Sequence, residues 1–355
     1  MKQTILHIGL EKTGTTSIQY LLSQNRSRLL ESSILVSNTT NAGNNFHLAI
    51  ASYSKFRADG LTKQLGITNQ QQLDAFRNKK LQSLKQEIAA AKPERVILSS
   101  EHFQSRLLTV EDISLVKTSL ESIGLGNFKI LLYLRDPLKI VMSHHGMAIK
   151  KGVHVTDAFY RPEHPRISHI IDNKKSLQNW QAVFGREAID ARIYVESQPA
   201  EALLSDFLGA CEVSKQQIDM SKQEVRNVNL SAAALRALNQ VNATSDRVRV
   251  LAEDRWLFNQ LEKRHPGKGL TPATATIELF DDRFEADHKQ ISTEWFGGKE
   301  PLFAAKWAAA EQIDEVEEAA VAKDIEELIA AAMRRHRLSG LTKLPRRLAK
   351  RLLGR

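Results

Sequence analysis

The chain has 355 residues, 42% of them hydrophobic, which is enough to bury a large core and excludes global disorder. Its single cysteine, Cys211, excludes an intrachain disulfide and a four-thiolate metal site, and this is typical of a reducing compartment. The formal net charge is +9, but residues 334–355 hold nine of the 50 basic groups and no acidic group. The remaining chain carries 41 basic and 41 acidic groups, and this balance argues against a nucleic-acid-binding face.

Targeting and membrane signals are missing from the sequence. The chain leads directly into a strand-like run without the basic start and long apolar stretch of a signal peptide. No segment approaches the roughly 18–20 apolar residues of a membrane span. The sequence therefore predicts a cytoplasmic protein.

Strand-like and helical segments alternate over the first 200 residues. Short apolar runs typical of strands lie at residues 4–8, 34–36, 95–98, 129–134 and 191–195, and helical spacing marks 17–30, 69–91 and 177–184. Because the runs are apolar throughout, we expect a three-layer α/β fold with a central, mostly parallel sheet covered on both faces. Beyond residue 200 the pattern is mainly helical, and residues 303–337 predict one long helix or two short ones.

Polar clusters follow three of the predicted strands, at residues 9–17, 99–102 and 135–137. Ligands of parallel sheets bind beyond the carboxyl ends of the strands. We therefore expect the three clusters to converge at one edge of the sheet.

The first cluster, GLEKTGTTS, has the composition of a phosphate-binding loop between a strand and a helix. Its glycines permit a close backbone approach, and the amides of residues 14–17, together with the helix dipole, favour an anion. Lys12 adds a positive charge. The nucleotide-triphosphatase pattern requires Gly-Lys-Ser/Thr, but here Gly14 is followed by Thr15, so that pattern does not match.

A second segment, LLYLRDPLKIVMSHH, places Arg135 at a strand end, Pro137 at a helix start and Ser143 eight residues after the arginine. An arginine with a hydroxyl partner suits a phosphate. Together the two segments resemble the donor-binding motifs of sulfotransferases that use 3′-phosphoadenosine-5′-phosphosulfate (PAPS), in the bacterial branch of that family. Further similar segments extend the resemblance over about residues 2–303.

The resemblance implies a P-loop-like sulfotransferase fold and a role for each motif residue. Lys12 would neutralise the leaving phosphate of PAPS, and no metal is implied. The donor-binding residues would be Gly14, Thr15, Thr16 and Ser17 at the 5′-phosphate and Arg135 and Ser143 at the 3′-phosphate. Many members carry a Trp after the Thr pair to stack on adenine, whereas this chain has Ser17, so we expect adenine recognition near Arg226 and Asn229.

A general base for the acceptor hydroxyl must come from a carboxylate or a histidine. The candidates are Glu31, His47, Glu101 and His102. Glu101 follows the predicted strand ILSS and is the first choice, and His47 is the second. An ion pair with a helix-borne Arg or Lys is the alternative role for Glu101. The eleven histidines show no metal-ligand spacing.

The resemblance predicts a division into a sulfotransferase domain at residues 1–303 and a helical extension at 304–355. In the extension, residues 338–355 place leucines three or four apart among basic residues. This pattern is typical of a helix that lies on an anionic membrane, although a solvated terminus would look the same.

The leading hypothesis is a PAPS-dependent sulfotransferase acting on the hydroxyl of a bulky acceptor, a saccharide or glycolipid. Two hypotheses from other classes stay open. A nucleotide-dependent small-molecule kinase would need Mg²⁺ and an acidic ligand after a strand, for which Asp136 is available. A non-catalytic, membrane-peripheral binding protein would retain the nucleotide fold without its activity.

Overall fold

A computed structural model describes residues 2–38, 43–156, 160–222, 229–303, 307 and 314–342. The chain forms two compact units. Unit 1 comprises Met1–Ile140, Pro165–Arg226 and Arg283–Ala304, and unit 2 comprises Val141–His164, Asn227–Asp282 and Ala305–Arg355. This grouping differs from the expected division after residue 303, because segments from the middle of the chain cluster with the C-terminal helix.

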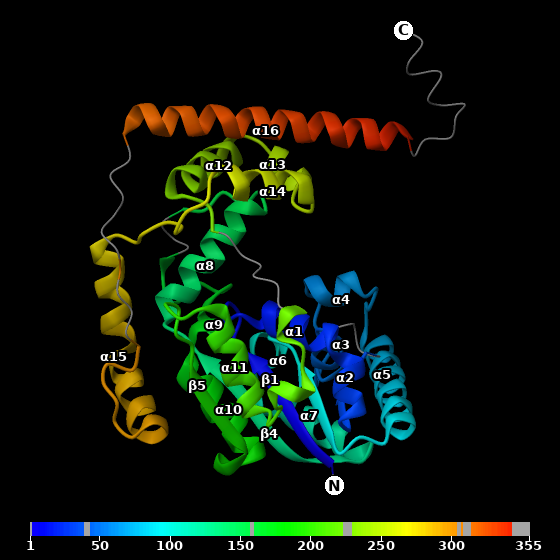
Figure 1. The fold of residues 1–355 in the computed structure, drawn as a ribbon. Coiled ribbons are helices and arrows are strands. Elements are labelled where there is room, and N and C mark those ends of the chain that lie inside the picture. The colour runs from blue at the N-terminus through cyan, green and yellow to red at the C-terminus, as the bar shows by residue number, and fades with distance from the viewer. Residues whose placement is uncertain are drawn as a thin grey trace. The chain divides into compact units, whose positions relative to one another are not determined.

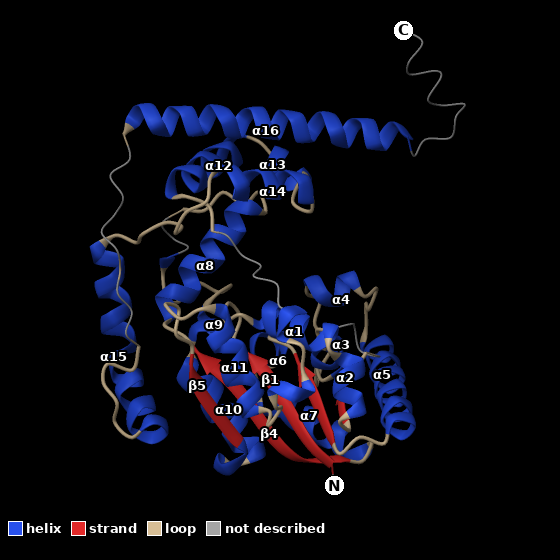
Figure 2. Ribbon diagram, viewed as in Figure 1, coloured by secondary structure: helices blue, strands red, loops and turns tan. Residues whose placement is uncertain are grey.

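Unit 1 is built on a five-stranded, wholly parallel sheet, drawn in red in Figure 2, with the strand order β2-β3-β1-β4-β5. The strands are β1 (Lys2–Gly9), β2 (Ile34–Val36), β3 (Arg95–Ser99), β4 (Leu125–Leu134) and β5 (Ile189–Ile193). All five predicted strands are confirmed, and so is the three-layer α/β class.

Helices cover both faces of this sheet (Figure 1). Those of unit 1 are α1 (Thr15–Gln24), α2 (Arg26–Glu31), α3 (Phe46–Ala51), α4 (Gly60–Gln64), α5 (Gln70–Ala91), α6 (His102–Arg106), α7 (Val110–Ser122), α9 (Ser168–Ile171), α10 (Asn173–Phe184) and α11 (Ala200–Ala210). Short 3-10 helices span Arg186–Ala188, Lys215–Gln217 and Met220–Lys222. Residues from α1, α2 and α11 form one core cluster with β1, β3 and β4. Helices α7 and α10 contact β4 but contribute nothing to that cluster, and they cover the opposite face.

The predicted helix over residues 17–30 is two helices, separated at Asn25. The side-chain amide of Asn25 donates to the carbonyls of Leu21 and Asp219, at 3.0 and 3.2 Å, and its oxygen accepts from the Asp219 amide at 2.6 Å. This contact with a distant loop ends α1. The predicted helix at 69–91 is confirmed as α5, which Asn69 caps through the Gln72 amide.

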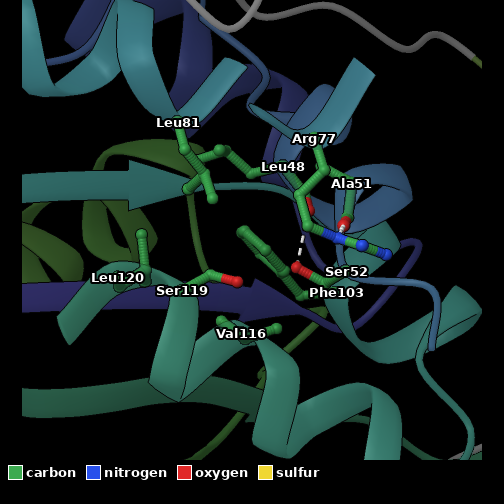
Figure 3. Close-up of a pocket in the computed structure, with 9 residues that line it drawn as sticks. All are labelled: Leu48, Ala51, Ser52, Arg77, Leu81, Phe103, Val116, Ser119 and Leu120. Carbon is green, nitrogen blue, oxygen red and sulfur yellow. Dashed lines mark hydrogen bonds between the residues drawn. The ribbon is translucent and has the colours of Figure 1, made fainter. Parts of the chain in front are cut away.

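Helix α3 is fixed against α5 beside a very small cavity (Figure 3). Arg77 of α5 donates to the Ala51 carbonyl at 2.6 Å and to the Tyr53 carbonyl at 2.7 Å, and so binds the end of α3. The cavity has a volume of about 10 Å³, which is at the limit for a single water molecule. It is therefore a gap in the packing and is too small to bind a substrate.

Unit 2 has its own core around α12 (Ala232–Thr244), α13 (Arg247–Val250), α14 (Arg255–Arg264) and α16 (Glu315–Thr342). Helix α8 (Pro137–Lys150) begins in unit 1 and continues in unit 2, and α15 (Thr274–Phe296) also has residues in both. Much of the predicted helical stretch 303–337 is found in α16. Residues 343–355 lie outside the described part of the chain, so the membrane-binding tail stays a prediction.

Acid should destabilise unit 1 through His7, whose side chain is fully buried in β1. Burial lowers the pKa of His7 from 6.5 to about 3, so between these values the unfolded chain binds a proton that the folded chain does not. The free energy of unfolding should therefore decrease as the pH is lowered below about 6.5, by up to about 1.4 kcal/mol per pH unit. Urea unfolding at pH 7 and pH 5 measures this. His7→Asn, which keeps a polar atom near the Ser99 hydroxyl, should reduce the dependence of the unfolding free energy on pH. An unchanged pH dependence would show that His7 is not its cause.

Candidate active site

Three adjacent strands, β3, β1 and β4, end at the edge of the sheet where the sequence predicts that the polar clusters meet. His7 of β1 pairs in register with Ser99 of β3, and Gly9 pairs with Leu132 of β4. A Cβ built on Gly9 would lie 3.0 Å from the Cα of Glu101, so the loop after β1 passes directly against Glu101. The clusters at 9–17 and 99–102 therefore lie together.

The loop after β1 leads into α1 through two residues in left-handed conformation, Lys12 with φ 66° and Gly14 with φ 76°. Gly14 is the N-cap of α1, and no side chain caps that helix. A Cβ on Gly14 would lie 2.3 Å from the Leu203 side chain, so only glycine fits without rearrangement. The first amides of a helix have no intrahelical acceptor, and here those of Thr15 and Thr16 are available to an anion.

The hydroxyls of the loop are not equivalent. Thr13 is fully buried, and its hydroxyl donates to the Leu10 carbonyl at 2.7 Å, which stabilises the loop itself. Thr15 is buried, Thr16 is exposed and Ser17 is half-buried. The main-chain amide of Ser17 already donates to the Gly14 carbonyl at 3.0 Å. A ligand would therefore be bound by the Ser17 hydroxyl and not by its amide.

Arg135, which follows β4, contacts the loop directly. Its guanidinium donates to the main-chain carbonyl of Lys12 and pairs with the carboxylate of Glu196. The carbonyl of Arg135 in turn accepts from the Asn173 side chain at 3.0 Å. Two segments 123 positions apart in the sequence therefore adjoin, through the side chain of Arg135 and the main chain of Lys12.

Glu101 is held by two side-chain amides. Gln19 of α1 donates to one carboxylate oxygen at 2.9 Å, and Asn44 donates to both oxygens, at 3.1 and 3.2 Å. Within the described residues no ion pair to Glu101 is found. The expected alternative role, pairing with a helix-borne Arg or Lys, is therefore not the arrangement in this structure. The sequence does not predict the contributions of Gln19 and Asn44.

The rings of His47 and His102 both contact the ring of Phe46. The His47 ring contacts Phe76 at a centroid distance of 5.7 Å, and the His102 ring contacts Phe46 at 5.9 Å. Burial, assisted by Lys80, lowers the pKa of His47 to about 4. His47 is therefore neutral at pH 7 and keeps the protonation state of a base. Glu31, the last residue of α2, lies just before β2 begins, which places it at the opposite edge of the sheet from Glu101.

The remaining predicted residues lie in unit 2 or outside the described part of the chain. Ser143 lies on α8 within unit 2, and its pairing with Arg135 around one phosphate stays a prediction. Arg226 lies outside the described residues. Asn229 is in unit 2, where its carbonyl accepts from the Gly267 amide at 2.7 Å.

Neither a metal site nor a membrane span is found in the described part of the chain. Over the described ranges, no group of three or more His, Cys, Asp or Glu side chains is arranged to hold a metal ion. Asp136, the acidic residue available to a kinase, accepts from the Lys139 amide at 2.9 Å and caps α8. None of the helices that the structure describes combines the length and the apolar character needed to span a membrane.

The chain is distantly similar to a solved structure. No family model matches it, and no curated protein matches it in sequence. Among solved structures it is similar to the crystal structure of a sulfotransferase from Alicyclobacillus acidocaldarius, at 14% sequence identity and a TM-score of 0.42, with 71% of this chain and 95% of that chain covered. A similarity this distant establishes neither family nor activity, so the functional assignment has to come from the chain's own residues.

Proposed function

We propose that this protein is a sulfotransferase that transfers a sulfuryl group from PAPS to an acceptor hydroxyl. The observation that supports it most strongly is the hydrogen bond from Arg135 to the Lys12 carbonyl. This contact joins the loop of the first PAPS-like motif to the arginine of the second, which supports a shared binding site. Beside them lies Glu101, a carboxylate held in place by amide donors.

In the proposed reaction the acceptor oxygen forms a bond to sulfur while the bond between sulfur and the bridging phosphate oxygen breaks. The hydroxyl proton passes to the Glu101 carboxylate, and the electron pair of the broken bond stays on the phosphate of 3′-phosphoadenosine-5′-phosphate (PAP). Lys12 and the first amides of α1 stabilise that developing negative charge. Fixed donors of this kind act without reorganisation at the moment of reaction.

Glu101 is proposed as the base because its orientation is defined before any substrate binds. The amides of Gln19 and Asn44 leave it little freedom to rotate, and a base has to lie within hydrogen-bond reach of the proton that it removes. The acceptor is proposed to be a saccharide or glycolipid. Labelled sulfate transfer from PAPS onto cell-envelope fractions is the direct screen for it.

The donor can be tested by thermal unfolding. PAP at about 100 times its Kd should stabilise the protein by about 2.7 kcal/mol, which raises the Tm by several degrees. ATP with Mg²⁺ should raise it far less. Arg135→Gln should abolish the response to PAP, whereas Arg186→Gln, which removes an arginine stacked on Trp295, should preserve it.

Each of the other outcomes identifies a different class of protein. A larger response to ATP with Mg²⁺ would favour the kinase and contradict the proposal. A response to neither nucleotide would favour the non-catalytic binding protein.

A further inference from the structure

Arg135 is a buried cation whose counter-ion comes from an exposed residue. Its side chain is 10% exposed, whereas that of its partner Glu196 is 47% exposed. The Nε atom of Arg135 is buried and has no hydrogen-bond partner among the described residues. Apart from the Lys12 carbonyl, the guanidinium is satisfied only by a carboxylate that water reaches from outside.

A second cation contacts the same carboxylate. Lys139 lies in the first turn of α8, four residues after Arg135, and its Nζ is 3.5 Å from Glu196 Oε2. The side chain of Lys139 is 19% exposed. Glu196 thus lies between two largely covered cations, while the neighbouring carboxylate of Asp136 is engaged with the α8 backbone. Of the two acids, Glu196 is the one that is free to leave.

The side chains gathered around Glu196 are those of an anion-binding site. Tyr194 lies beside it, with its ring centroid 5.2 Å from Arg135 Cζ, so the guanidinium is flanked by an aromatic face as well as by the loop. A buried charge without a counter-ion is costly, which explains why a carboxylate occupies this position in the protein alone. A phosphate monoester, with nearly two negative charges and three acceptor oxygens, would satisfy both cations better.

We propose that Glu196 occupies the position of the donor's 3′-phosphate and is displaced by it, and that Lys139 is a second cation for that phosphate. This inference rests on the proposed function. No covalent bond changes in the exchange: the carboxylate moves into water, and the phosphate takes over its contacts with Arg135 and Lys139. Glu196 thereby competes with the donor and lowers its apparent affinity.

Calorimetric titration with PAP and with AMP, which lacks the 3′-phosphate, tests the exchange. Glu196→Gln should raise the affinity for PAP about fivefold, equal to about 1 kcal/mol for a partly exposed ion pair. Lys139→Gln should lower that affinity by a similar factor. Neither substitution should change the affinity for AMP, because AMP does not reach this site.

Glu201→Gln is the matched control. It removes the same charge from the exposed first turn of α11 and should leave the affinities for both nucleotides unchanged. If the wild type binds PAP and Glu196→Gln binds it equally well, the exchange is wrong and the proposed function stands. An equal gain for AMP would also overturn the exchange. If the wild type binds neither nucleotide, both the proposed function and this inference fail.

Discussion

Lys12→Met should lower the kcat of sulfuryl transfer by about 10²–10³-fold, the usual cost of losing one donor to a developing negative charge. Methionine keeps much of the length of lysine but removes its charge. The substitution should leave the loop in place, because Arg135 binds the main-chain carbonyl of residue 12 and not its side chain. The affinity for PAPS should fall much less than kcat, since the leaving phosphate gains its additional negative charge only as the bond to sulfur breaks.

Single-turnover transfer from labelled PAPS measures the chemical step, and the dependence of its rate on PAPS concentration measures binding of the donor. Lys63→Met provides the matched control, because Lys63 is exposed on α4 and should show wild-type kinetics. A Lys12→Met enzyme within a few-fold of the wild-type rate would remove Lys12 from its proposed role.

Glu101→Gln should lower kcat by about 10²–10⁴-fold, the range expected for loss of a general base. Glutamine has the same shape, and its oxygen can still accept from Gln19 or Asn44, so the site should keep its structure. The Tm and the affinity for PAP should stay near those of the wild type.

His47→Asn distinguishes the two candidate bases. His47 contacts Phe76 and is already neutral at pH 7 because its pKa is about 4. If Glu101 is the base, His47 only packs against the aromatic rings beside it, and its replacement should change kcat only a few-fold. A large loss in His47→Asn, combined with a small loss in Glu101→Gln, would reverse the assignment.

The sheet could be predicted because its strands are apolar on both faces. Ile5, Leu6 and Ile8 of β1 are all fully buried, and such a run has few alternatives to a central parallel strand. The division of helix 17–30 could not be predicted, because it depends on the contact between Asn25 and Asp219, 194 positions away. Boundaries fixed by tertiary contacts are not encoded in local periodicity.

The sequence predicts those residues of the candidate site that directly follow a strand, but not those that come from helices and other loops. Glu101 was expected at this edge because it follows β3 directly. Gln19, which orients Glu101, comes from the buried face of α1 beside Ile18 and Leu22. A polar residue on the apolar face of a helix was the one sequence feature that could have indicated the role of Gln19. Asn44 comes from the segment before α3, and Glu196 from the segment after β5, and neither has a pattern that points to this edge.

The close approach of Gly9 to Glu101 limits what substitutions near the proposed site can change. A Cβ at position 9 would lie 3.0 Å from the Cα of Glu101, so the spacing between the loop after β1 and Glu101 is set by the main chain, and substitutions of other side chains should barely alter it. In the proposed reaction, the choice of acceptor would then depend on segments outside this contact, while the separation of Gly9 from Glu101 stays defined by the backbone.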